Sequence, residues 1–259
     1  MTSNDVANHP FPLINTPISQ LPAGTEPDAF HRCASEMACV HNMVIRGLNS
    51  IYLQAQHVAD KDVKPFLGYA SCFYDLLSVH HKGEEEDLFP QIEKMAGKTG
   101  IMDQNVEQHR MFHDGLEEYN AYIRLCLNSP DNYDGGKLVR IIDSFGPALA
   151  QHLAAEITTI LELAKYGKKM DELEKLFAAW AEKDTRQLSI PGALTWGFFN
   201  HDRDFEGGLW KEWPPAPAPL VLIVRHVTYW VHSDWWKFAP CDPSGKMKSK
   251  LHAAPQMLE

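Results

Sequence analysis

The sequence predicts an all-α protein built on an up-down four-helix bundle, with one additional helix and an irregular, aromatic C-terminal extension. From residue 28 to residue 168, apolar side chains recur at three- and four-residue steps, the period of an amphipathic helix. Short connections divide this region into four stretches, which favours antiparallel packing of neighbouring helices. Hydrophobic residues make up 44% and charged residues 22% of the 259 residues, a composition typical of a folded globular chain.

The composition divides the chain into three parts. Residues 1–27 are rich in Pro, Asn, Ser and Thr without periodicity, and are expected to form an N-terminal arm. Residues 28–168 are expected to form the bundle. Residues 169–259 are expected to form a further helix and an aromatic segment that wraps the bundle or covers its site as a lid.

The helices of the bundle are expected at residues 34–58, 63–96, 102–127 and 137–166. We expect the second helix to be kinked or interrupted at Pro90, because proline removes a helix hydrogen bond and clashes with the preceding turn. Segments containing glycine, residues 97–100 and 129–136, separate the last three helices.

Beyond the bundle, a fifth helix is expected at residues 170–183, because apolar residues line one side of it. Six of the seven tryptophans follow residue 190, and residues 214–219 form a stiff, proline-rich spacer. Residues 221–231 are apolar enough for a buried helix or a strand, and periodicity does not separate the two at that length.

Charge and cysteine content exclude several classes of protein. The chain has 24 basic and 34 acidic residues, a net charge of −10, with no run of Lys or Arg, which argues against nucleic-acid or anionic-membrane partners. The N-terminus lacks the features of a signal peptide, and no apolar run is long enough to span a membrane. Five scattered cysteines, an odd number, indicate a reducing compartment, so we expect a cytoplasmic protein.

Histidine is the unusual residue, with 13 copies, and several lie four positions from another metal-ligating residue. Residues four apart share one face of a helix, so both side chains can reach one metal site. Surface histidines are the better explanation of any single pair, but they do not explain one pair on each of three predicted helices, with an inward-facing histidine on the first. Metal coordination is the most direct way to satisfy so many polar groups in a bundle core. The set is His41, His81/Glu85, His109/His113 and His152/Glu156.

Residues 80–90 read HHKGEEEDLFP, which resembles the HHxxEExxLFP signature of hemerythrin-like, HHE cation-binding domains. The other histidines of the set follow in the family's order, and the resemblance covers residues 28–168. It implies a four-helix bundle that encloses two iron ions, with the seven residues of the set as ligands. Residues 235–242 are also similar to the Trp- and Pro-rich extension of fungal members.

The signature contains two histidines, and the choice between them depends on helix phase. Because two residues separate Glu85 from Leu88-Phe89, Glu85 matches the family's carboxylate, and His81 is its partner one turn earlier. His80 is about 100° from that face of a regular helix, so we expect it to support the site from outside or to contact a neighbouring helix.

The resemblance assigns His109, His113 and His152 to one ion, and His41 and His81 to the other. Five imidazoles, two bridging carboxylates and one oxo or hydroxo bridge leave one position open on two octahedral ions. Dioxygen, peroxide or nitric oxide is the expected occupant. Iron follows from the resemblance, since imidazole-rich sites also suit other metals, and zinc or manganese remains open.

Four functions are compatible with such a centre. An enzyme oxidises a small organic molecule, a binding protein carries or stores dioxygen or iron, a sensor responds to either, and a structural metal only holds the bundle together. The aromatic extension favours the enzyme, because a lid of residues 196–238 beside the open metal position would form a pocket for an organic substrate.

Overall fold

The computed structural model describes residues 10–253, so the first nine residues of the predicted N-terminal arm lie outside it. All regular elements in this range are helical, and a single isolated bridge pairs Cys241 with Met247. Within the same range, no helix is long and apolar enough to cross a membrane.

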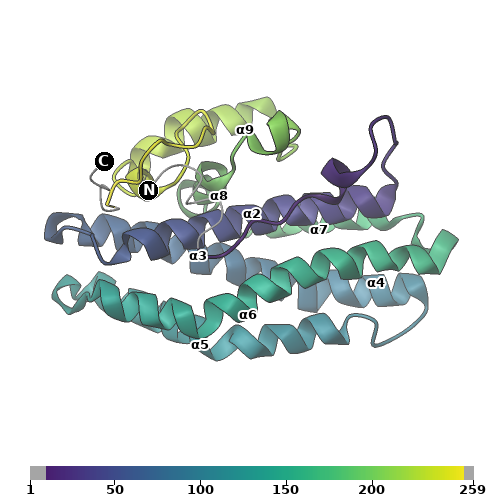
Figure 1. The fold of residues 1–259 in the computed structure, drawn as a ribbon, viewed down its shortest axis with the longest axis horizontal. Helices are drawn as coiled ribbons and strands as arrows, with labels where there is room; N and C mark the ends of the chain where they lie inside the picture. Colours follow the sequence, from purple (N-terminus) through teal and green to yellow (C-terminus); the bar gives the residue numbers. More distant parts are fainter. Residues whose placement is uncertain (1–9, 254–259) are drawn as a thin grey trace.

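Four long helices run along the longest axis of the molecule in up-down order, as the sequence predicts (Figure 1). Helix α6 packs against α2 and α5, and α3 packs against α5, which closes most of the bundle. Short helix α4 continues the direction of α3. The bounds are α2 Ala29–Ala55, α3 Val63–Gly83, α4 Phe89–Ala96, α5 Asp103–Asn128 and α6 Gly135–Glu162.

Side-chain caps and a left-handed glycine explain where several of these helices begin and end. The Asp28 carboxylate accepts a hydrogen bond from the His31 backbone N–H at 2.9 Å, which caps α2. Asp134 caps α6 in the same way through the Lys137 N–H at 3.0 Å. Helix α4 ends at Gly97, whose φ of 64° is a conformation that glycine adopts without strain.

The interruption expected at Pro90 occurs one turn earlier, as a π-helical turn at Glu84–Leu88 between α3 and α4. The Phe89 N–H donates to the Glu84 carbonyl, five residues back, and Pro90 has no N–H to donate. A π turn holds one residue more than an α turn, so it changes the phase of the helix around it.

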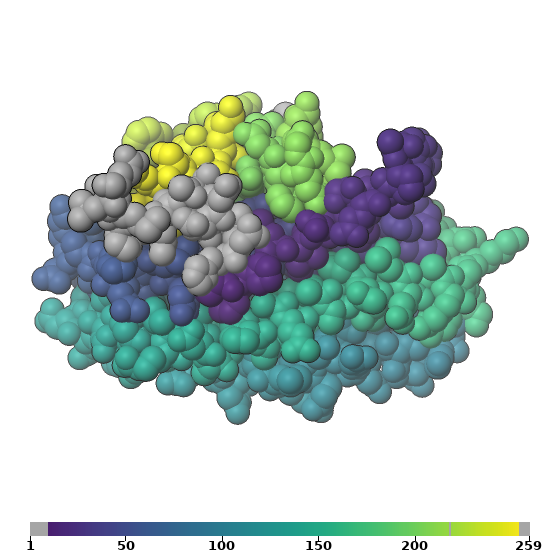
Figure 2. Space-filling model, viewed as in Figure 1, coloured from purple at the N-terminus to yellow at the C-terminus, as the bar shows by residue number. Residues whose placement is uncertain are grey.

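The C-terminal extension fills a gap between α2 and α3, two helices that contact each other little. Helices α7 (Leu173–Thr185) and α8 (Thr195–Asn200) contact both of them. Trp196 of α8 is fully buried, with its ring centroid 5.8 Å from that of Tyr69 and 6.2 Å from that of Phe73. The extension covers one side of the bundle, as the green and yellow atoms of Figure 2 show.

The apolar segment at residues 221–231 is helical, which agrees with one of the two predicted alternatives. It is not buried throughout. Helix α9 (Ala218–Leu222) leads into further helical turns that end at His232. Val224 faces the core, whereas Val227 is 60% and Trp230 73% exposed. The burial expected for a helix here is therefore confined to one face, because the segment lies on the outside of the molecule.

Candidate metal centre

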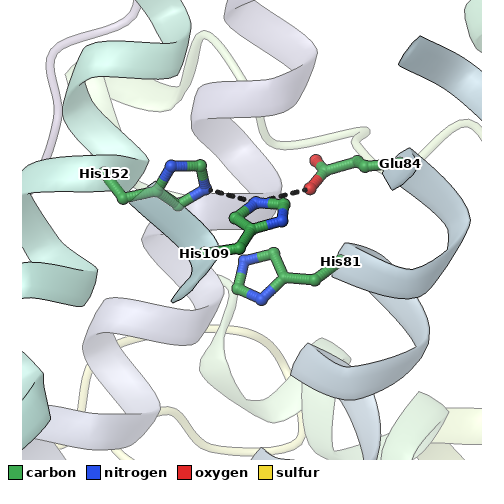
Figure 3. Close-up of side chains that lie close together, drawn as sticks. All are labelled: His81, Glu84, His109 and His152. Carbon is green, nitrogen blue, oxygen red and sulfur yellow. Dashed lines mark hydrogen bonds and ion pairs between the residues drawn. The ribbon is translucent and has the colours of Figure 1, made fainter. Parts of the chain in front are cut away.

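Seven buried side chains from the four bundle helices and the π turn meet inside the bundle. Figure 3 shows four of them, His81, Glu84, His109 and His152, pointing toward one another from different elements. Each of the seven is at most 8% exposed. The seven are His41 of α2, His80 and His81 of α3, Glu84 of the π turn, His109 of α5, and His152 and Glu156 of α6.

Three of the histidines form one group around Glu84. The Nε2 atoms of His109 and His152 are 3.0 Å apart, and the ring centroids of His81 and His109 are 4.3 Å apart. His109 Nε2 also lies 3.5 Å from Glu84 Oε2. One potential ligand atom from each of these four residues lies within 4.8 Å of the others, which is close enough for one ion to contact all four.

The other two histidines form a second, smaller group on the opposite side of Glu84. His41 Nε2 lies 3.2 Å from His80 Nε2, and His80 Nε2 lies 3.1 Å from Glu84 Oε1. Ligand atoms of His41, His80 and Glu84 also fall within 4.8 Å of one another. The centre therefore has a three-histidine half and a two-histidine half.

Two carboxylates lie between the halves. Glu84 directs Oε1 toward His80 and Oε2 toward His109, so its two oxygens face different halves. Glu156 Oε2 lies 3.5 Å from His41 Nε2 and 3.7 Å from His152 Nε2. Each carboxylate therefore lies within reach of both halves.

Hydrogen bonds at the outer ring nitrogens fix how three of the imidazoles face the centre. The Nδ1 atom of His41 lies 2.8 Å from the Leu153 carbonyl, that of His109 2.6 Å from Glu85 Oε1, and that of His152 3.1 Å from Gln108 Oε1. Because these partners accept hydrogen bonds, each Nδ1 carries the proton and each Nε2 presents a lone pair inward. The facing Nε2 atoms of His109 and His152 then have no proton between them, an arrangement that a cation stabilises.

Burial makes the same groups poor at holding charge without a cation. Desolvation lowers the pKa of His41 to about 3, and it lowers the pKa of His80, His81 and His152 well below the ordinary value. Desolvation raises the pKa of Glu156 to about 8. Burial, and then the nearby Glu156 carboxyl, raise the pKa of Glu84 well above its ordinary range.

Several polar atoms of the centre also lack a hydrogen-bond partner within residues 10–253. They are His81 Nε2 and both carboxylate oxygens of Glu84 and of Glu156. An unsatisfied buried polar group costs about 1–3 kcal/mol, so five such atoms in one cluster are a strong reason to expect a ligand. The set of five imidazoles and two carboxylates therefore fits two metal ions.

The structure differs from the sequence prediction at Glu85 and His113, which it does not bring into the cluster. The Glu85 side chain is 42% exposed and contacts the outer nitrogen of His109. His113 is 66% exposed, with its Nδ1 3.4 Å from Asp114. Phe112 and Leu116 occupy the inner face of α5 below His109, so His113 projects outward.

His81 lies with His109 and His152, where His113 was expected, and His80 lies with His41, where His81 was expected. Glu84 takes the place expected for Glu85. A regular helix up to Leu88-Phe89 would place Glu85 on the inner face, whereas the π turn inserts an extra residue there and shifts the inward carboxylate from Glu85 to Glu84. The only signal in the sequence is that His80/Glu84 is itself an i,i+4 pair. His41, His81, His109, His152 and Glu156 lie in the cluster, as expected.

A cavity of about 650 Å³ lies beside the two-histidine half, and His80 forms part of its wall. Helices α2 and α3 line one side of it, and α7, α8 and the segment from Trp213 to Leu220 line the other. Among tryptophans of the C-terminal extension, Trp180 and Trp213 line the cavity, whereas Trp196 and Trp236 are buried in the core. The extension therefore forms part of a pocket next to the centre and part of the core.

Comparisons with known proteins agree with this geometry. The family model described as "Hemerythrin HHE cation binding domain" matches residues 35–164. A protein of Cryptosporiopsis sp. (strain 8999), named "Dimeric xanthone biosynthesis cluster protein R11", is 33% identical over 245 residues, which cover 93% of this chain and 90% of the relative. No solved structure matches the chain significantly.

Proposed function

The chain belongs to the hemerythrin HHE cation-binding family, and from this premise we propose that it is a non-haem, dinuclear iron enzyme. It uses dioxygen or peroxide to oxidise a small organic molecule.

The observation that carries the proposal is the unequal division of the histidines around two bridging carboxylates. His81, His109 and His152 would hold one ion, and His41 and His80 the other, with Glu84 and Glu156 between them. The two-histidine half has one protein ligand fewer, which suits the half where a reactant binds. That half adjoins the cavity through His80.

The protein's own residues do the positioning. Bound iron would supply the redox chemistry for the reaction with dioxygen or peroxide. Leu153, Glu85 and Gln108 hold three imidazoles by their outer nitrogens, so that their lone pairs stay directed inward. The packed helices keep bulk water from the centre.

The cavity favours an enzyme over a carrier of a diatomic gas. A volume of about 650 Å³ lies within the range of small-molecule sites, and a dioxygen carrier needs far less. The name of the Cryptosporiopsis relative places that protein in a biosynthesis cluster for an organic compound, which supports a small organic substrate here.

The test compares wild type with His80→Ala, and uses His113→Ala as the matched control. Each iron-loaded, reduced protein is incubated with dioxygen and a small-molecule extract of the producing organism, and products are followed by mass spectrometry. We expect two metal ions per chain and a consumed metabolite for wild type and His113→Ala, but not for His80→Ala. Oxygen consumption and products identical to those of the metal-free protein would contradict the proposal.

A further inference from the structure

The cavity beside His80 has the walls of a site for a flat, apolar molecule. Most residues that line it are hydrophobic, and aromatic rings come from α7, from α8 and from Trp213. Two methionines of α2 add flexible, polarizable side chains that adapt to the face or edge of an aromatic ring. The principal wall residues are Met37, Met43, Phe177, Trp180, Phe198 and Trp213.

The charged residues at the cavity disfavour an anionic ligand. Three carboxylates line it, on Glu36, Glu182 and Asp184, against one cation, Arg186. Arg186 is already paired with Glu182. A ligand carboxylate or phosphate would meet net negative charge without a free cationic partner among the lining residues, a cost that grows as water is excluded.

Two buried polar atoms of α7, on residues that line the cavity, have no hydrogen-bond partner among the described residues. Asp184 is 8% exposed, and its Oδ1 accepts from Gln187 Nε2 at 3.2 Å, but its Oδ2 has no hydrogen-bond partner within the part of the chain described. The indole Nε1 of Trp180 is also buried without one. The two residues are four apart, so they share one face of α7.

One acceptor and one donor on the same face match a hydroxyl group, which both donates and accepts. Because buried unsatisfied groups are costly, a ligand hydroxyl that satisfies both gains more than it would on an exposed surface. The Trp180 ring also lies against the centre, with its centroid 5.6 Å from that of His80. A ring held at Trp180 is thereby held next to the two-histidine half.

We propose that this cavity selects an uncharged, hydroxylated aromatic compound, whose hydroxyl group donates to Asp184 and accepts from Trp180 Nε1. This inference rests on the proposed function, since it names the substrate class of the same centre. Aromatic stacking and apolar burial provide affinity, and the two α7 groups provide selectivity for the hydroxyl.

The test measures binding by equilibrium dialysis of the metal-loaded, full-length protein under argon, so that oxidation does not interfere. The probes are 1-naphthol, naphthalene and 1-naphthoate, which share a ring system and differ in the polar group. We expect the Kd of 1-naphthol to be at least about tenfold lower than that of either other probe, because a buried hydrogen bond contributes about that much affinity. Equal affinities, or tightest binding of 1-naphthoate, would overturn the inference.

Substitutions at Asp184 and Trp180 test whether these two residues cause the preference for 1-naphthol. Asp184→Ala and Trp180→Phe should each weaken 1-naphthol binding about tenfold and leave naphthalene binding nearly unchanged. Asp171→Ala, at an exposed carboxylate outside the cavity, should change neither. Metal content and circular dichroism check that each variant is folded. If both α7 variants keep the preference for 1-naphthol, Asp184 and Trp180 are not the residues that bind its hydroxyl group.

A cavity-filling variant tests the place of binding. Gly197 lines the cavity, and a Cβ there would be no closer than 3.5 Å to its neighbours, so a larger side chain fits locally but occupies cavity volume. Gly197→Leu should abolish binding of both neutral probes without loss of metal, and unchanged binding would place the probes elsewhere. Selective binding without metal-dependent oxidation would refute the proposed function alone, whereas oxidation without selective binding would refute this inference alone.

Discussion

Two neighbouring glutamates of the π turn have opposite environments. Glu84 is fully buried between the two histidine groups, whereas Glu85 is partly exposed and contacts the outer nitrogen of His109. In the proposed centre, Glu84 would contact both ions, and Glu85 would orient one of their ligands. Side chains one position apart thus have separate roles, and matched substitutions can distinguish them.

We expect Glu84→Gln to lose at least one of the two ions, since it removes the negative charge that both would share. Glu85→Gln should keep both ions at saturating metal and weaken their affinity about tenfold, as loss of a partner to a ligating histidine does. Metal analysis after dialysis against graded free metal measures both effects. The reverse pattern, in which Glu85→Gln loses metal and Glu84→Gln keeps both ions, would show that Glu85 is the ligand, as the sequence predicts.

At the scale of elements, apolar periodicity was enough to predict four helices with ends a few residues from those observed. It also predicted that His41, His109, His152 and Glu156 face inward, since each lies on a regular stretch of helix. It misplaced Glu85, because a π turn depends on backbone hydrogen bonding around Pro90 that no side-chain pattern reports. It misplaced His113, because both His113 and Phe112 lie close enough to the face of His109 to compete for the core, and the apolar ring is the one buried.

Helix α8 depends on a glycine of α2. A Cβ at Gly47 would lie 2.0 Å from the Trp196 ring, so any side chain there forces the buried indole to move. We expect Gly47→Ala to lower the free energy of unfolding by about 1–3 kcal/mol, the usual cost of overpacking a core. Gly197→Ala is the control, because its Cβ would make only ordinary contacts and alanine favours a helix. Urea denaturation compares the two, and an unaffected Gly47→Ala would show that Trp196 does not fill this gap.

At the scale of the whole molecule, the C-terminal extension and the bundle share one hydrophobic core. Phe199, Trp236 and Phe238 of the extension are buried in the same cluster as residues of α2, α3, α5 and α6. The same extension also lines the cavity through Phe198 and Trp213. The sequence left a structural wrap and a lid as alternatives, since composition does not show which face a tryptophan contacts. The structure places one part of the extension in the core and another part around the cavity.

Metal removal should destabilise the folded chain. The metal-free protein must bury lone pairs that face one another and carboxyl oxygens without partners, and metal binding relieves both. A ligand at a thousand times its Kd stabilises the native state by about 4 kcal/mol, so chelation should lower Tm clearly. Calorimetry before and after chelation measures the effect, and re-addition of iron should reverse it. An unchanged Tm would argue against metal within the bundle core.

The most direct measurement is anomalous X-ray diffraction at the iron edge, on crystals of full-length protein from iron-replete growth. We predict two anomalous peaks per chain, one beside His41 and His80 and the other among His81, His109 and His152, with Glu84 and Glu156 contacting both. A single peak, or a peak beside Glu85 and His113, would contradict the centre described here.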